Sequence, residues 1–174
     1  MRKILSGLLS TLIAVSTPAS AALKVGDKAP DFVTTGALAG KPFKLRLSSE
    51  LKKGPVVLYF FPKAFTKGCT LEAHAFSEAS ADFAKMGAHV IGMSADDLTT
   101  LKKFSVEECR NAFPVATATK PIIKAYDVAL PLVGMTNRTS YVIGRDGRIA
   151  MVHSEMDWSE HVAKSLAAVK ALKR

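Results

Sequence analysis

Cysteine is scarce in this chain of 174 residues, which contains only Cys69 and Cys109. No C-x-x-C pair occurs, and no cluster of cysteine and histidine has the spacing of zinc ligands. The sequence therefore predicts neither a metal site nor a bound cofactor. Two cysteines allow at most one disulfide, which would close a loop of about 40 residues (109 − 69). In the chain-entropy model such a loop stabilises a fold by roughly 4 kcal/mol.

The chain also lacks an apolar run of membrane-spanning length. Its extended apolar stretch, Ile4–Val15, would form a helix of roughly 18 Å, whereas the hydrocarbon core of a bilayer is about 30 Å thick. The stretch follows the basic residues Arg2 and Lys3, and it precedes a small-x-small pattern at Ala19–Ala21. This order of features is typical of a secretory signal peptide.

We interpret residues 1–21 as a cleaved signal peptide rather than a retained membrane anchor. The mature chain, residues 22–174, is long enough for one domain and too short for two. We therefore expect an exported protein, periplasmic in a Gram-negative bacterium, with no membrane association after cleavage. Disulfides can form and persist in such a compartment.

Basic runs are missing despite a formal net charge of +9. Lysine and arginine outnumber aspartate and glutamate by 24 to 15, but no run of basic residues is longer than two. No basic block is interleaved with aromatic residues, as nucleic-acid surfaces often are. The sequence therefore predicts a solvated basic surface and no nucleic-acid partner.

Strand-like segments are present and are separated by helix-like ones. Val56–Phe61 is a continuous run of β-branched and aromatic residues followed by Pro62, which is typical of a strand buried on both faces. Similar patterns predict strands at 88–95 and 113–118, and a hairpin over 139–154 that turns at Arg145–Gly147.

Apolar residues at spacings of three and four predict three helices, over about 70–86, over about 97–110, and from Trp158 with Asp157 as its N-cap. The first helix has the apolar stripe Leu71, Ala75, Ala79, Phe83 and Met86, and the last has Val162, Leu166, Val169 and Leu172. Residues 22–50 are predicted to be irregular with a short hairpin. Strands alternating with helices predict a layered α/β domain with a central mixed sheet flanked by helices.

Cys69 occupies a chemically special position in this pattern. It follows a buried strand, begins a helix and is preceded by Gly68. The first N–H groups of a helix have no acceptor within it, so an anion is stabilised there. Lys63 and Lys67 add positive potential. The position therefore favours a reactive thiolate over the alternative of a buried filler residue.

Pro62, Thr66 and Cys69 form the pattern P-x-x-x-T-x-x-C. This pattern and three further stretches resemble the peroxiredoxin family, and in particular its bacterioferritin comigratory protein or Q-type subfamily. The resemblance continues in "CTLEAHAF", in the early "VGDKAPDF" and in "NRTSYVIGRDGRI", which places the family's active-site arginine at Arg138. It extends from about residue 24 to the C-terminus.

The resemblance implies a thioredoxin-like fold and a thiol-dependent peroxidase with an antioxidant role. Hydrogen peroxide and organic hydroperoxides would be the substrates, and a thioredoxin-like or other thiol would be the reductant. Cys69 would be the peroxidatic residue, oxidised to a sulfenic acid. Thr66, Arg138 and nearby backbone N–H groups would stabilise the departing oxygen, and Pro62 would shape the pocket.

The second thiol is where this sequence departs from many Q-type members. Their resolving cysteine lies five residues after the peroxidatic one, a position that is His74 here. Other members carry it on the following helix, which implies Cys109 as the resolving residue and a monomeric enzyme. This would require the helix at Cys69 to unwind in part. The alternatives for Cys109 are a structural disulfide or an unpaired core residue.

Two other classes of protein stay open. A thiol–disulfide oxidoreductase of the same fold would need two closely spaced cysteines, which "GCTLEAH" lacks. A non-catalytic exported domain held by a disulfide would explain the leader and the two cysteines. It would leave Pro62, Thr66 and the helix start at Cys69 without a function.

Overall fold

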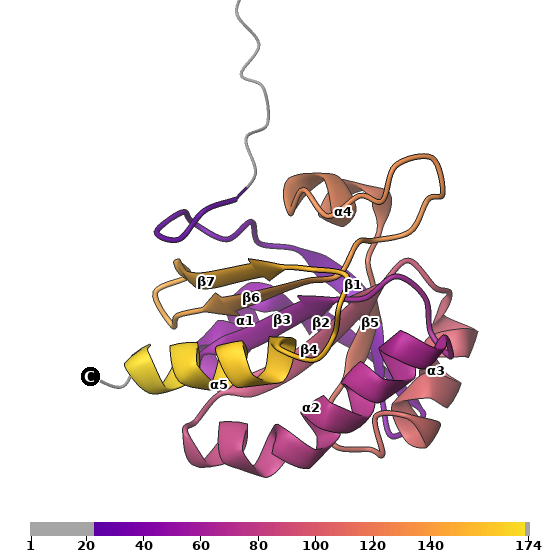
Figure 1. The fold of residues 1–174 in the computed structure, drawn as a ribbon, viewed down its shortest axis with the longest axis horizontal. Coiled ribbons are helices and arrows are strands. Elements are labelled where there is room, and N and C mark those ends of the chain that lie inside the picture. The colour runs from indigo at the N-terminus through magenta and orange to yellow at the C-terminus, as the bar shows by residue number, and fades with distance from the viewer. Residues whose placement is uncertain (1–22, 173–174) are drawn as a thin grey trace, which may run out of the picture.

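Within residues 23–172, which the structure describes, seven strands form one mixed sheet with helices on both faces (Figure 1). The structure is a computed structural model, and the predicted signal peptide at 1–21 lies outside the described residues. The strands are β1 (Val33–Leu38), β2 (Lys41–Arg46), β3 (Val56–Phe60), β4 (His89–Ser94), β5 (Val115–Thr117), β6 (Thr139–Ile143) and β7 (Ile149–Ser154). The helices are α1 (Leu47–Lys53), α2 (Lys67–Lys85), α3 (Leu98–Glu107), α4 (Lys120–Ala125) and α5 (His161–Leu172).

The strand order across the sheet is β2-β1-β5-β4-β3-β6-β7. Strands β3, β4 and β5 are parallel. The β6–β7 hairpin adds to β3 in antiparallel fashion, and the β1–β2 hairpin does the same at β5. This arrangement confirms the predicted α/β architecture with a mixed central sheet.

Strand β3 lies in the middle of the protein and is buried on both faces, as its sequence predicts. Leu58 and Phe60 belong to the core on one face, whereas Tyr59 and Phe61 belong to the core on the other. All four side chains are 0% exposed. The continuous apolar run is therefore explained by two cores that take alternate side chains of one strand.

The helices divide between these two cores. Side chains of α1 and α4 enter the first, and side chains of α2, α3 and α5 enter the second. Figure 1 shows α2 and α5 side by side on one face of the sheet. No helix within residues 23–172 is long and apolar enough to cross a membrane.

The structure adds two helices to those predicted and shifts the start of a third. The sequence patterns missed α1 and α4, because helices of seven and six residues are too short to show an apolar repeat. The segment 22–50 does contain the predicted hairpin, β1–β2. Helix α5 begins at His161 rather than Trp158, and the Asp157 carboxylate accepts the N–H of Ser159 at 2.9 Å in the segment before it.

The buried face of α2 also differs from the predicted stripe. Its buried residues are Cys69, Glu72, Ala73, Phe76 and Phe83, whereas Leu71 is 37% exposed. Residues 69 and 71 are separated by about 200° around a helix, so both cannot face the sheet. The helix therefore turns Cys69 inward at the expense of Leu71.

Phe76→Ala is expected to lower the free energy of unfolding by about 3–5 kcal/mol. The Phe76 ring is fully buried and stacks on Tyr59, with ring centroids 4.3 Å apart. Leu71→Ala is the matched control on the same helix and should cost less than about 1 kcal/mol. Urea denaturation measures both values. Equal losses of unfolding free energy in the two variants would mean that Leu71 is buried, as the sequence pattern predicted.

Candidate active site

Cys69 is the third residue of α2, in the loop-to-helix junction that follows β3. The strand ends at Phe60, and Pro62, two residues later, has no N–H with which to extend the sheet. Phe65 has a φ of 63°, which turns the chain, and Thr66 in extended conformation is the N-cap of the helix. Cys69 thus belongs to the first turn of the helix, whose N–H groups have no acceptor within it.

Arg138 lies beside this sulfur. Its Nη2 is 3.6 Å from Cys69 Sγ, and the two residues are 4% and 1% exposed. The sheet explains the juxtaposition, because Thr139 at the start of β6 pairs with Phe60 at the end of β3. The residue before Thr139 therefore lies at the end of β3 from which the Cys69 loop departs.

Three donors fix the orientation of the Arg138 guanidinium. Nη2 points to Cys69, Nη1 donates to the Glu72 carboxylate, and Nε donates to the carbonyl of Met156 at 2.9 Å. The planar guanidinium of arginine has N–H donors that point in these three directions. The site is therefore a buried sulfur held between a helix N-terminus and an oriented cation, an arrangement that stabilises negative charge.

Comparison with known proteins agrees with this geometry. A sequence model of the AhpC/TSA family matches residues 25–152. Peroxiredoxin Bcp of Bacillus subtilis is 30% identical, with 85% of this chain and 96% of the relative covered. The chloroplastic peroxiredoxin Q of Oryza sativa subsp. japonica is 31% identical, with 84% and 67% covered. The chain belongs to the AhpC/TSA family of peroxiredoxins.

Solved structures support the same relation. The peroxidoxin BcpB of Mycobacterium tuberculosis superposes on this peroxiredoxin with a TM-score of 0.79 at 33% identity, covering 87% of this chain and 99% of that one. AhpC of the same organism superposes with a TM-score of 0.75 at 22% identity, which bears on the fold alone. The predicted thioredoxin-like fold is confirmed, and family membership makes this chain a thiol peroxidase of the antioxidant class.

Glu72 is the residue of the site that the sequence analysis missed. It is 0% exposed, and its carboxylate pairs with Arg138. Its spacing from Cys69 could have revealed it, because a residue three positions after Cys69 on a helix lies on the same buried face as Cys69. An acidic residue on a buried face needs a cationic partner. Burial raises the pKa of Glu72 to about 8, an effect that Arg138 only partly offsets.

The catalytic roles of Thr66 and Pro62 stay predictions. Thr66 precedes Cys69 by three residues, and its hydroxyl donates to the carbonyl of Lys63 at 2.9 Å. That bond leaves the hydroxyl oxygen as an acceptor and holds the loop between β3 and α2 in shape. Pro62 is half-buried at the start of the same loop.

Cys109 lies just beyond the end of α3, whose last residue is Glu107, and not within the helix as predicted. It is 0% exposed and shares the hydrophobic core that contains Cys69. Both cysteines are thiols in the structure. Burial, aided by the charge of Glu108, raises the pKa of Cys109 far above its ordinary value. The Cys109 thiol is therefore unreactive in this conformation.

A hydrogen bond and an ion pair tie the neighbours of Cys109 to α2. His74 Nε2 lies 2.7 Å from Glu108 Oε2, and Arg110 Nη1 lies 3.2 Å from Glu78 Oε1. His74 thus occupies the sequence position of the second thiol in many relatives and holds the segment that carries Cys109. We call these two contacts the Cys109 clamp.

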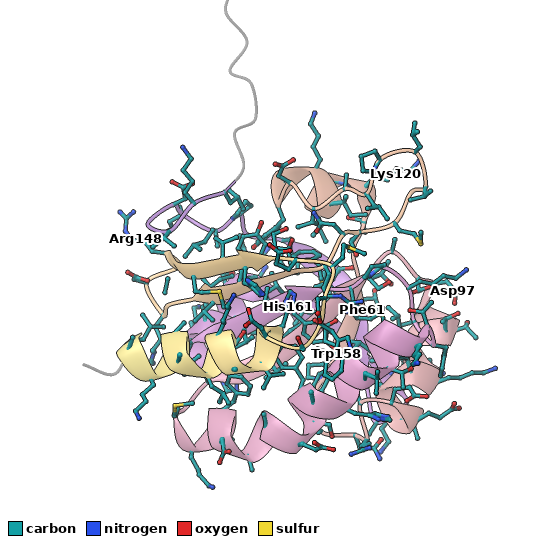
Figure 2. The ribbon with its side chains drawn as sticks, viewed as in Figure 1. Phe61, Asp97, Lys120, Arg148, Trp158 and His161 are labelled. Carbon is teal, nitrogen blue, oxygen red and sulfur yellow. The ribbon has the colours of Figure 1, made fainter. Side chains whose placement is uncertain are left out.

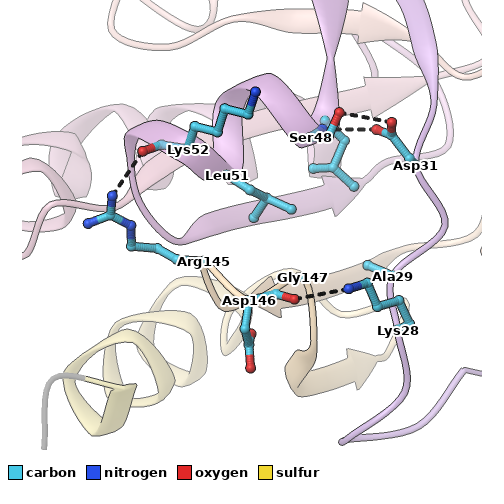
Figure 3. A pocket seen from close by; sticks show the side chains of 10 residues that line it. Lys28, Ala29, Asp31, Ser48, Leu51, Lys52, Arg145, Asp146 and Gly147 are labelled. Atoms are coloured by element: carbon cyan, nitrogen blue, oxygen red, sulfur yellow. Dashed lines mark hydrogen bonds between the residues drawn. The ribbon is translucent and has the colours of Figure 1, made fainter.

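A pocket of about 260 Å³ lies away from this site (Figure 3). Lys28, Leu51 and Arg145 are among the residues that line it, and Arg145 donates to the Lys52 carbonyl at 3.0 Å. Arg145 follows β6, whose Ile143 pairs with the first residue of β3. The pocket therefore lies at the end of β3 opposite Cys69. Across residues 23–172, no three His, Cys, Asp or Glu side chains are grouped so as to hold a metal ion.

Gly68→Ala is expected to slow the reaction of Cys69 with hydrogen peroxide about ten-fold. A Cβ at Gly68 would lie 3.1 Å from Arg138 Nη2, and the three bonds of the guanidinium resist displacement. Alanine favours a helix over glycine by about 1 kcal/mol, so the melting temperature should hold or rise. Stopped-flow kinetics and thermal melting test the pair of effects. An unchanged rate would show that the guanidinium position is not critical.

Proposed function

We propose that this peroxiredoxin reduces hydrogen peroxide and organic hydroperoxides with the thiolate of Cys69. The observation that carries the proposal is the 3.6 Å contact between Arg138 Nη2 and Cys69 Sγ, with both side chains almost fully buried. A cation at this distance in a dry site stabilises the thiolate before the reaction. It also stabilises the charge that develops on the departing oxygen.

In the proposed step, the Cys69 thiolate attacks one peroxide oxygen. An S–O bond forms and the O–O bond breaks, so the sulfur loses two electrons and becomes a sulfenic acid. The departing oxygen takes up a proton and leaves as water or as an alcohol. Thr66 and the first-turn N–H groups of α2 are the further polar groups at the site, and Pro62 shields the sulfenic acid from water.

Cys109 is proposed to resolve the sulfenic acid. Its thiol attacks the Cys69 sulfur, an S–S bond forms and water leaves. Because Cys109 is fully buried, its segment must open and the first turn of α2 must unwind in part. Arg110 and Asn111 have φ values of 50° and 61°, which are unfavourable for residues with side chains. Opening would relieve this strain.

The remainder of the cycle and the cellular location are proposed on sequence grounds. A thioredoxin-like or other thiol reductant would return the disulfide to two thiols by exchange. Both cysteines lie in one chain, so the cycle needs no second subunit, and we propose a monomer. The leader-like residues 1–21 support export, to the periplasm in a Gram-negative cell.

An intramolecular Cys69–Cys109 disulfide is expected after the reduced protein reacts with one equivalent of hydrogen peroxide. Cys69→Ser should retain its remaining thiol, and Cys109→Ser should stop at the sulfenic acid. Peptide mapping by mass spectrometry identifies each product. With protein expressed with its own leader in a Gram-negative host, the same spectra are expected to place the mature N-terminus at Ala22.

Other products would contradict specific parts of this proposal. A Cys69–Cys69 bond between two chains, or accumulation of a sulfinic acid, would exclude Cys109 as the resolving residue. A disulfide that is present before peroxide and survives mild reductant would favour the non-catalytic, disulfide-held domain.

His74→Ala is expected to speed disulfide formation about three-fold, because it removes one contact of the Cys109 clamp. His74→Gln is the matched control, since its amide can still hydrogen-bond to Glu108 and should keep a rate near that of the natural protein. Stopped-flow mixing with limiting peroxide measures the rate. A slower reaction in His74→Ala would mean that the clamp aligns Cys109 and does not restrain it.

A further inference from the structure

A row of buried polar side chains leads from Arg138 away from Cys69. Glu72 and His161 are both 0% exposed. Glu72 Oε1 lies 3.7 Å from His161 Nδ1, and within residues 23–172 this oxygen has no hydrogen-bond partner. Figure 2 shows His161 at the first turn of α5, between that helix and the sheet.

The hydrogen bonds of His161 define where its proton lies. Nε2 is 3.0 Å from the carbonyl of Glu155, which only accepts, so Nε2 carries a hydrogen. Nδ1 is 2.8 Å from Ser140 Oγ, and in the neutral ring it accepts from that hydroxyl. In the neutral ring Nδ1 carries no hydrogen, so His161 offers no donor to Glu72 Oε1 at 3.7 Å. If Glu72 were ionised, a buried carboxylate oxygen would lie there without a donor, which is costly.

The charges of the reactive state lead to the same conclusion. Arg138 contributes one positive charge, and a Cys69 thiolate contributes one negative charge. An ionised Glu72 beside a neutral His161 would leave the buried group with a net negative charge. One proton on the Glu72–His161 pair makes the pair neutral, and the guanidinium then balances the thiolate.

We propose that His161 is a positioning residue that holds one proton on Glu72, so that the positive charge of Arg138 acts on Cys69. The inference rests on the proposed function, because it concerns the thiolate that attacks the peroxide. No hydrogen bond joins His161 to the sulfur, and its effect passes through Glu72.

The surroundings of the pair place the proton on Glu72. Burial raises the pKa of Glu72 to about 8 despite the opposing effect of Arg138. Burial lowers the pKa of His161 to about 4, and nearby positive charge acts in the same direction. The titratable and charged groups around His161 are Glu72 on α2, Arg138 before β6, His153 on β7, Lys164 on α5, and Glu155 and Asp157 in the loop before α5.

The proposal gives the peroxide reaction an alkaline decline. Below about pH 8 Glu72 is neutral, and the charge of Arg138 is available to the sulfur and to the departing oxygen. Above that pH Glu72 loses its proton, and its carboxylate neutralises the guanidinium. An ordinary thiol behaves in the opposite way, because its thiolate fraction and its rate rise with pH.

The experiment compares the mature natural chain with Glu72→Gln, His161→Leu and His161→Asn. The glutamine amide accepts from Arg138, donates toward His161 and cannot ionise. Asparagine can place an amide oxygen where Nδ1 lies, whereas leucine of similar size cannot accept a hydrogen bond. For each protein, the rate of Cys69 oxidation by hydrogen peroxide and the infrared carbonyl band of a protonated carboxylic acid are recorded against pH.

The natural chain should lose both rate and carbonyl band near pH 8. His161→Leu should lose them about one pH unit lower, His161→Asn should resemble the natural chain, and Glu72→Gln should lack both the band and the decline. Identical midpoints in the Leu and Asn variants, or a decline that persists in Glu72→Gln, would overturn the proposal. If His161→Leu does not fold, the Glu72→Gln profile decides alone.

The two readouts separate this inference from the proposed function. The infrared band reports the proton on Glu72 whether or not the protein reacts with peroxide. A band that shifts as expected in a protein inert to peroxide would overturn the proposed function and leave the shared proton established. A peroxide-reactive protein without the band would overturn the inference alone.

Discussion

The Arg138 guanidinium and the Glu72 carboxyl group are in contact beside Cys69, and both are shielded from water, with Arg138 4% and Glu72 0% exposed. Removing a charge from water costs several kcal/mol, and hydrogen bonds return this cost only in good geometry. The surrounding structure supplies that geometry. The Met156 carbonyl accepts a hydrogen bond from Arg138 Nε, and Nη2 faces the Cys69 sulfur.

The sheet and two helices meet at this contact between Arg138 and Glu72. The antiparallel pairing of β6 with β3 brings Arg138 to the end of the strand from which the Cys69 loop departs. The rotation of α2 brings Cys69 and Glu72 to the same buried face. Helix α5 then covers the far side of the carboxylate with His161. A shift of any one element would leave a buried charge without its partner, which explains why the site needs the whole fold.

The sequence predicted those parts of the site that local pattern determines. The buried strand before Cys69, the hairpin after Arg138 and the family motif each have a contiguous signature. Glu72 and the rotation of α2 were missed because Leu71 and Ala75 formed a more hydrophobic stripe than the face that is buried. Tertiary contact decided that rotation, since a polar face can be buried when a distant arginine completes it. No local pattern contains that information, because Glu72 and Arg138 are 66 residues apart.

Burial favours the reactive form of Cys69 and makes Cys109 less reactive. The environment that sets Arg138 against Cys69 depends on exclusion of water, and the same core encloses Cys109 and raises its pKa. A resolving cysteine five residues after Cys69 would lie on the same helix, but here that position holds His74, which clamps Glu108. The proposed resolution by Cys109 would therefore need a closed state for the reaction with peroxide and an open state for formation of the disulfide. The left-handed φ values of Arg110 and Asn111 and the exposed ion pair of Arg110 with Glu78 mark the segment that would open.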